Sequence, residues 1–349
     1  YGPTWGFLTG WASFFAGFSA PIAAAALAVS DYLGFFFPAL RTDAVLWKGG
    51  GDFLSVQIGG AQVLAVSLIA LLTLLNCFGL REVAGVQNLL TAIKIGVVLG
   101  FIGLGFLLGS GDTAHFTEQT ERTSEVALPA QFAISLFWVM FGYSGWNAAT
   151  YIAEEIRHPE RTLPKALALG TLLVTALYVG LNLVFLYGAP LGEMKGVLAI
   201  GSLAAQKLFG SEAAGIFSAL MALSLVATVN AMVMIGPRLY FAMAKNGAFF
   251  RWASIVNPVR RTPTRAILAQ GACAALMTLT SFPQLVIFIS FVLVFFSGMA
   301  VSAIFTLRKR PGWQRLGVVS FAFPMLPVLY MAAAAWMIVY GVRLQPVVS

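Results

Sequence analysis

Long stretches of this sequence contain no Asp, Glu, Lys or Arg. They cover residues 1–30, 53–80, 95–111, 126–153, 166–192, 213–237, 266–307 and 316–342. A helix that crosses a bilayer needs about 20 predominantly apolar residues, so most stretches supply one span, and residues 266–307 supply two around a turn at Phe282-Pro283-Gln284. Only helices and closed barrels satisfy their backbone hydrogen bonds in lipid. The sequence therefore predicts an all-α integral membrane protein with nine transmembrane helices.

We predict one polytopic membrane domain over residues 1–349. Of all residues 59% are hydrophobic and 10% are charged, whereas about a quarter of a soluble protein is charged. This composition excludes a soluble enzyme, a secreted disulfide-bonded domain and a nucleic-acid-binding domain. Cys77 and Cys273 lie in apolar spans and form no redox or metal pattern, so we expect neither metal nor cofactor. The spans are expected at about residues 7–30, 56–79, 86–109, 130–153, 166–188, 213–243, 265–281, 284–307 and 317–341.

The loops between the predicted spans differ in charge. Alternate loops, at residues 81–94, 154–165, 238–265 and 308–315, hold 15 of the 21 Lys and Arg residues but only 4 of the 13 acidic residues. The positive-inside rule places these loops in the cytoplasm. We therefore expect a protein of the plasma or inner cell membrane with its N-terminus cytoplasmic and its C-terminus extracytoplasmic. The net charge of +8 then attracts anionic inner-leaflet lipid, and no nucleic acid partner is needed.

Small and polar residues gather in the middle of one predicted span. Residues 142–147, with the sequence GYSGWN, contain two glycines, a serine and an asparagine. Glycine costs about 1 kcal/mol in a helix relative to alanine, and Ser and Asn offer competing hydrogen bonds to the backbone. Such a cluster can unwind a helix and turn its backbone groups towards a cavity, as the broken helices of secondary transporters do. A close-packed interface of small residues is the other interpretation.

Three ordered motifs carry a family resemblance. Residues 141–167, FGYSGWNAATYIAEEIRHPERTLPKAL, resemble the sixth span and following loop of the amino-acid/polyamine/organocation (APC) superfamily. Asn76–Gly79 with Val86–Lys94 is similar to the junction of its fourth and fifth spans, and Gly236–Gly247 to the end of its eighth. The chain thus resembles an amino acid permease of this superfamily over essentially its whole length.

The resemblance implies a fold and a set of site residues. Members of this superfamily have twelve spans, with two inverted five-span repeats (5+5) that hold substrate between broken first and sixth helices. The nine predicted spans then correspond to the third to eleventh, and the chain lacks the first two and the last. Family roles in amine binding fall on Phe141, as an aromatic gate, and on Gly142 and Ser144, although a core aromatic is the alternative interpretation of Phe141. Gly145, Trp146 and Asn147 complete the predicted substrate-binding set.

Lys94 is a second candidate. It lies about 12 Å along its helix from Val86 at 1.5 Å per residue, and an ionisable residue at membrane depth is a functional candidate. Its stem can instead extend to the cytoplasmic surface. In the family a lysine here takes the place of a sodium ion, which implies sodium-independent transport and a coupling or structural role for Lys94. Whether it carries protons is left open.

Further polar residues follow the broken span. Glu154, Glu155 and Arg157 are expected to form an ion-pair network at an inner gate, and a solvated helix end is the alternative. Asn230 lies in the middle of another span, where it can form a hydrogen bond to a neighbouring helix.

These observations predict a secondary active transporter, not an enzyme. It would move amino acids or related amines by alternating access, through sodium-independent exchange or proton symport, and a non-transporting amino-acid sensor on the same scaffold is the alternative. The chain has no phosphate-binding Gly-Lys-Ser/Thr motif that would indicate ATP drive. Expected partners are the substrate and membrane lipid, with a homo-oligomer or an accessory subunit left open. Without its first two spans, the chain alone is expected to show no saturable uptake.

Overall fold

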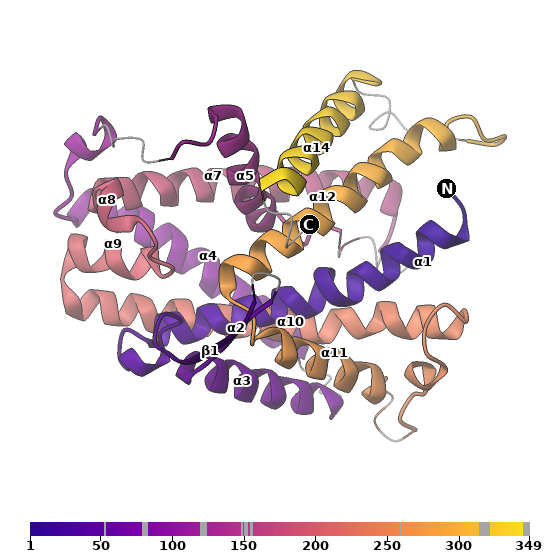
Figure 1. Cartoon of the computed structure of the whole chain (residues 1–349), viewed down its shortest axis with the longest axis horizontal. Helices are drawn as coiled ribbons and strands as arrows, with labels where there is room; N and C mark the ends of the chain where they lie inside the picture. The colour runs from indigo at the N-terminus through magenta and orange to yellow at the C-terminus, as the bar shows by residue number, and fades with distance from the viewer. Residues whose placement is uncertain are drawn as a thin grey trace.

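A computed structural model describes the chain apart from residues 52–53, 79–82, 119–123, 148, 150–152, 154–155, 259, 261, 314–321 and 345–349. The described part consists of helices that run mostly along one common direction, together with a single two-stranded hairpin (Figure 1).

The first membrane helix changes its geometry halfway along its length. It runs from Pro3 to Leu33 as α1 (Pro3–Ala12), a π-helical segment η1 (Ser13–Ser19) and α2 (Ala20–Leu33). Isolated π-helical turns inside α-helices are rare and occur frequently at functional sites. This one therefore marks the middle of the first helix as a place to look for function.

The remaining helices differ widely in length. The long ones are α3 (Gly60–Cys77), α4 (Val83–Leu108), α7 (Pro159–Gly188), α10 (Ser211–Lys245), α12 (Phe282–Leu307) and α14 (Met325–Leu344). The shorter ones are α5 (Leu128–Gly142), α8 (Leu191–Met194), α9 (Ile200–Phe209) and α11 (Thr264–Met277), with 3-10 turns η2 (Pro38–Leu40), η3 (Thr113–Phe116) and η5 (Arg251–Ser254).

Seven helices in the described part of the chain are long and apolar enough to cross a membrane. The sequence predicted nine. The two that fall short are α5 with 15 residues and α11 with 14, below the roughly 20 residues of a full span. The first ends where Gly142-Tyr143-Ser144-Gly145 leaves helical geometry, and the second ends in a turn at Thr278. The all-helical membrane class agrees with the structure, while nine spans and the 5+5 repeat stay predictions.

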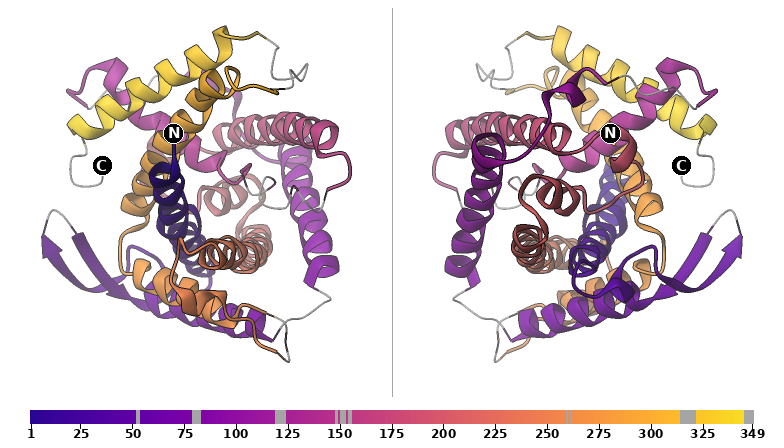
Figure 2. Two further views of the ribbon diagram at one scale, coloured as in Figure 1. Left: turned by 90° about the vertical axis from the view of Figure 1, so that its right-hand side faces the viewer. Right: turned by 90° about the vertical axis from the view of Figure 1, so that its left-hand side faces the viewer.

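A β-hairpin occupies the region where the second span was expected to begin. Strands β1 (Val45–Gly51) and β2 (Leu54–Gly59) pair antiparallel, so the helix expected from about residue 56 starts at Gly60. The Gln57 amide donates to the Leu279 carbonyl at 2.7 Å, which ties the hairpin to the turn after α11. Figure 2 shows the hairpin reaching outward beyond the helices.

The core lies where α2 and α10 pack against each other and against α3, α11 and α12. Its largest fully buried side chains include Ile22, Leu27, Ile69, Val229 and Ile289. The apolar stretches of α4 and α7 are different, since only 11% and 6% of their residues are buried. These two helices therefore present apolar surface that suits lipid or another apolar partner.

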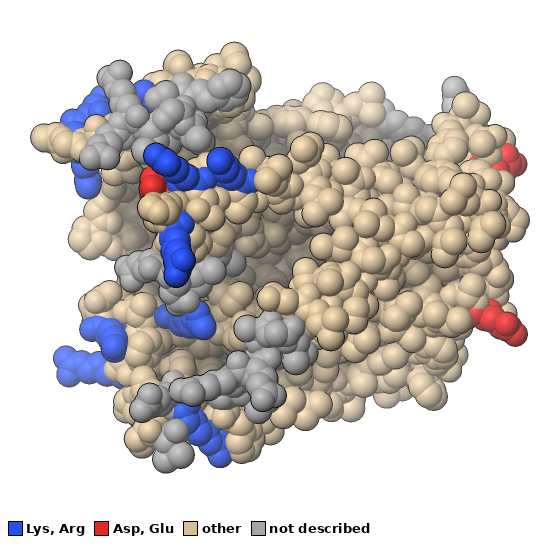
Figure 3. Space-filling view, turned by 180° about the vertical axis from the view of Figure 1, so that it is seen from behind, with Lys and Arg blue, Asp and Glu red and all other residues tan. Residues whose placement is uncertain are grey.

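Charged side chains separate along the molecule. On the face drawn in Figure 3, Lys and Arg gather at one end of the helices, where acidic atoms also lie beside them, and the opposite end shows Asp and Glu without Lys or Arg. This separation agrees with the charge pattern of the loops. We call the two ends the basic end and the acidic end, and the assignment of the basic end to the cytoplasm stays a prediction.

Candidate functional site

The helix α5 ends at the residues predicted to break it. The amides of Tyr143 and Ser144 still bond back to Val139 and Phe141, at 3.0 and 3.1 Å. Gly145 then takes a φ of +94°, a conformation that only glycine adopts without strain. Residues 143–147 form a turn, so their backbone groups lie outside a regular helix.

Two tyrosines fix this break against α7. The Tyr178 hydroxyl donates to the Gly142 carbonyl at 2.7 Å, satisfying a carbonyl at the helix end. The Tyr143 hydroxyl donates to Thr175 Oγ1 at 3.0 Å, and the two tyrosine rings meet edge to face with centroids 5.3 Å apart. The break is thus held in place from the neighbouring helix.

A cavity of about 550 Å³ lies beside the turn. Its walls come from the first helix, from Met140 and residues 143–147, from α7 and from α12 and α14. The helices α12 and α14 lie side by side (Figure 1). None of its described lining residues is charged. Small-molecule sites are typically 300–1,000 Å³ in volume, mostly apolar with a few placed polar groups, and this cavity fits that description. Its polar lining residues are Thr9, Ser13, Tyr143, Ser144, Asn147, Thr171, Ser297 and Tyr330.

Four of the six predicted substrate-binding residues line this cavity: Ser144, Gly145, Trp146 and Asn147. Phe141 instead packs against the core and meets the Phe282 ring edge to face at 6.3 Å. The Gly142 carbonyl is bonded to Tyr178. The structure therefore brings the turn residues together at the cavity and places the predicted gate outside its lining, while the substrate roles of all six stay predictions.

Sequence reasoning missed the partners of the turn in the first helix and in α12. Thr9, Ser13 and Gly17 line the cavity from α1 and η1. Their spacing of four residues puts them on one helix face, which is the signal that the sequence offered. In α12 the contributors are Val292, Leu293, Val294, Phe296, Ser297, Ala300 and Val301, and nothing distinguishes them from ordinary apolar helix residues.

Lys94 belongs to α4 and is not among the lining residues of the cavity. Its side chain reaches α10. Its Nζ donates to Thr228 Oγ1 at 2.6 Å, and Thr228 Oγ1 donates to the Ser224 carbonyl at 3.2 Å. Two residues further along α10, Asn230 Oδ1 accepts from Asn76 Nδ2 at 2.9 Å. The cross-helix bond predicted for Asn230 is therefore confirmed, and Lys94 is joined to the same helix by a second polar contact.

The expected inner gate falls mostly outside the described part of the chain, because Glu154 and Glu155 are not among the described residues. Arg157 is exposed, and its carbonyl accepts from Thr162 Oγ1 at 2.9 Å. No group of three or more His, Cys, Asp or Glu residues that could hold a metal ion occurs among the described residues. The chemistry available at the cavity is therefore hydrogen bonding and apolar contact with a small ligand.

The family model and the three relatives described here are all of amino acid permeases, transporters or exchangers. The sequence model of the amino acid permease family matches residues 1–347. The chain is 32% identical over 341 residues to the serine/threonine exchanger SteT of Bacillus subtilis (strain 168), which covers 96% of this chain and 72% of SteT. It is 28% identical over 293 residues to the human large neutral amino acids transporter small subunit 2, covering 83% of this chain and 54% of that protein. It is also 27% identical over 339 residues to the human b(0,+)-type amino acid transporter 1, covering 94% of this chain and 65% of the relative.

Proposed function

Because this chain belongs to the amino acid permease family, we propose that it moves small or apolar neutral amino acids across the cell membrane by alternating access. Family membership and the transporter relatives place it among multi-pass membrane transport proteins rather than enzymes. The observation that supports the choice of substrate is the uncharged cavity beside the α5 break.

The cavity can meet both ends of an amino acid without using a charged side chain. An ammonium or carboxylate that leaves water needs several hydrogen-bond partners, and backbone outside a helix provides them. Thr9 and Ser13 donate their hydroxyl protons to the carbonyls of Trp5 and Thr9, both at 2.8 Å. Their oxygens therefore remain acceptors for a ligand. Apolar walls from Val292, Leu293 and Phe296 suit an apolar substrate side chain.

The names of the relatives support neutral substrates. One is a serine/threonine exchanger and another a transporter of large neutral amino acids. Neither name supports the sensor alternative. The second relative is named as a small subunit, and an accessory subunit for this chain stays a prediction.

We further propose that transport is independent of sodium, that the basic end faces the cytoplasm and that the described spans are the third to eleventh of twelve. The hydrogen bond from Lys94 Nζ to Thr228 Oγ1 supports the first point, because it joins the ammonium group in α4 to α10, and both helices are apolar enough to cross a membrane. Glu154, Glu155 and Arg157 keep their proposed place at an inner gate because they directly follow the broken span, at its proposed cytoplasmic end.

The test is labelled L-serine flux into proteoliposomes that contain the protein with any flanking segments its gene encodes. We expect saturable entry in sodium-free buffer that rises at least tenfold when the lumen holds unlabelled L-serine, which is the behaviour of an exchanger. Entry into empty vesicles that depends on an inward proton gradient, and that Lys94→Gln abolishes, would select symport instead. Binding of L-serine without flux under either condition would contradict transport and support the sensor.

A further inference from the structure

A row of aromatic rings lies where the first helix meets the segment after α10. Phe7, Trp11 and Phe15 are four residues apart and share one helix face, and the ring centroids of successive members are 5.7 and 6.1 Å apart. The Phe250 ring meets Trp11 at 5.6 Å, and Trp252 stacks on Phe250 at 5.9 Å. Four of these five side chains are exposed, from 37% for Phe15 to 52% for Phe250. We call the five residues the aromatic patch.

The segment after α10 is fixed to the body of the protein beneath this patch. Phe249 and Ala253 are buried, and the Phe249 ring lies 5.0 Å from that of Trp11 and 5.9 Å from that of Tyr240. Residues 250–252, between the two buried positions, are all exposed. The patch is therefore a preformed surface, and a ligand would not have to order a loose loop in order to bind there.

The cations beside the patch have no acidic residues near them in the sequence. Residues 213–349 contain eleven Lys and Arg residues and no Asp or Glu. Among them, Lys245 ends α10, and Arg251 follows between the two exposed rings of the patch. Both are exposed, and neither forms an ion pair within 4.0 Å in the part of the chain that the structure describes. This positive charge favours an anion from outside the chain.

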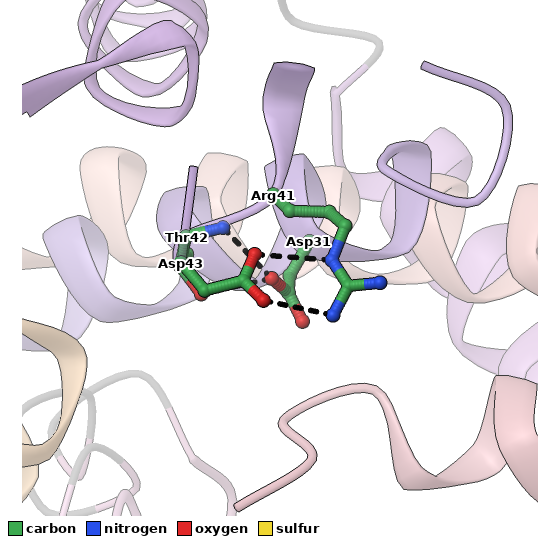
Figure 4. A network of polar contacts seen from close by, with 4 residues as sticks. All are labelled: Asp31, Arg41, Thr42 and Asp43. Atoms are coloured by element: carbon green, nitrogen blue, oxygen red, sulfur yellow. Dashed lines mark hydrogen bonds and ion pairs between the residues drawn. The ribbon is translucent and has the colours of Figure 1, made fainter. Parts of the chain in front are cut away.

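Charges at the other end of the first helix are compensated differently. In the loop after α2, Arg41 holds Asp43 in a two-pronged pair, with Nε at 3.0 Å from Oδ1 and the second guanidinium nitrogen at 2.9 Å from Oδ2. Figure 4 shows this pair beside the Asp31 carboxylate. In α9, which shares a cavity with this loop, Lys207 pairs with Glu193 at 2.6 Å. There the cations have partners within the protein, so the exposed charge beside the aromatic patch is a local feature.

The position of the patch suits a lipid headgroup better than a soluble anion. The start of α1 contacts α10 (Figure 1), and both belong to helices apolar enough to cross a membrane. Aromatic side chains are enriched at the depth of the headgroups, where basic residues attract anionic lipids. The row from Phe7 to Phe15 is about 12 Å long at 1.5 Å per residue, close to the roughly 15 Å of half a hydrocarbon core. A soluble anion would meet the cations but leave these rings uncovered.

We propose that the aromatic patch binds an anionic phospholipid, with the headgroup phosphate at Arg251 and one acyl chain along the row from Phe7 to Phe15. Lys245 adds to the positive charge that the headgroup meets. None of these residues lines the cavity beside the α5 break, so the lipid site is separate from the proposed substrate site. Its assignment to the inner leaflet rests on the proposed orientation, whereas the binding itself does not.

The experiment measures binding of fluorescent phosphatidylglycerol to the protein, with any flanking segments its gene encodes, in detergent micelles. Unlabelled phosphatidylglycerol, phosphatidylcholine and glycerol phosphate serve as competitors. Arg251→Gln removes the charge at the patch, Arg251→Lys keeps it, and Trp252→Ser removes an exposed ring. Arg161→Gln is the matched control, because it removes an exposed arginine from the first turns of α7, a helix that packs against α4 and α9. Melting temperatures measured before lipid is added show whether each variant is folded.

We expect phosphatidylglycerol to compete about tenfold better than phosphatidylcholine, and glycerol phosphate not to compete. Arg251→Gln should weaken binding of phosphatidylglycerol about fivefold, the contribution of one basic side chain near an anionic surface. Arg251→Lys and Arg161→Gln should leave it nearly unchanged, and Trp252→Ser should weaken both lipids.

Two results would overturn the site. Equal competition by the two lipids, or equal losses in Arg251→Gln and Arg161→Gln, would show a general attraction of the basic end in place of a defined site. Competition by glycerol phosphate as strong as that by phosphatidylglycerol would assign the cations to a soluble phosphate. Neither result would bear on amino acid flux, so the proposed function would stand or fall separately.

Discussion

Replacing Gly145 by alanine is expected to lower the rate of L-serine exchange at least tenfold. The φ of +94° at this residue is a conformation that costs a residue with a Cβ about 1–3 kcal/mol, and 1.4 kcal/mol corresponds to a factor of ten. Space is not the obstacle, since an added Cβ would meet no described atom within 4 Å. The substitution therefore acts by reshaping the turn that lines the cavity. The measurement is exchange in proteoliposomes, corrected for the amount of folded protein.

Gly247→Ala is the matched control for that experiment. Gly247 also has a positive φ, of +75°, and an added Cβ there would meet none of the described atoms within 4 Å, but it follows α10 and is not among the lining residues of the cavity. Both variants carry backbone strain, so both are expected to lose some thermal stability. Exchange by Gly247→Ala should stay within about twofold of the unmodified rate. Equal losses of exchange in the two variants would show that general destabilisation, and not the turn, explains the effect.

Gly236→Ala is expected to destabilise the fold strongly, although it adds only one methyl group. Gly236 is buried in α10, and a Cβ at this position would overlap the side-chain amide of Gln270 in α11. Gln270 is fully buried, and its Nε2 donates to the Met232 carbonyl at 3.1 Å. Overpacking costs about 1–3 kcal/mol, and a lost buried hydrogen bond costs about 1–3 kcal/mol more. The gain from helix propensity, about 1 kcal/mol, offsets only part of this, so we expect a clear fall in the melting temperature in detergent.

Two further variants separate overlap from other causes. Gly170→Ala places a methyl group in the interior of α7, where no atom of the described part of the chain lies within 4 Å, and it should leave the melting temperature unchanged or raise it. In the background Gln270→Ala, the overlap at Gly236 disappears, so Gly236→Ala should cost much less there. A full cost in that background would contradict the proposed contact between the two helices.

The sequence predicted an all-helical membrane protein because the signal of apolar helices is local. Runs of uncharged residues locate them, and the glycines and polar residues of 142–147 locate the end of α5. The position of Asn230 was enough to predict a bond to another helix, now seen with Asn76. Each of these features depends on side chains that are close together in the chain or on the cost of a polar group in lipid.

Features that depend on tertiary contacts were not predictable in this way. The uncharged stretch from residue 53 was predicted to be helical, but part of it forms strand β2. This strand is stabilised by pairing with β1 and by the contact with Leu279, and neither partner can be recognised from the stretch itself. The π-helical segment η1 shifts hydrogen bonds by one residue without a distinct sequence pattern. Similarly, the contribution of Ser297 and Tyr330 to the cavity arises from how α12 and α14 pack beside the turn. Phe141 shows the same limit. It is next to residues 142–147 in the sequence, but it does not line the cavity.

The central claim is that an amino acid occupies the cavity between the α5 break, the first helix and α12, and substrate protection tests it most directly. In a background with Cys77→Ala and Cys273→Ala, Ser144→Cys and Ser297→Cys each place one thiol in the cavity lining, from segments far apart in the sequence. Thr117→Cys, at an exposed position after η3, serves as the reference. We predict that L-serine slows alkylation by N-ethylmaleimide several-fold at both cavity positions and leaves the reference unchanged. Unprotected thiols at both positions in protein that still exchanges L-serine would contradict the claim.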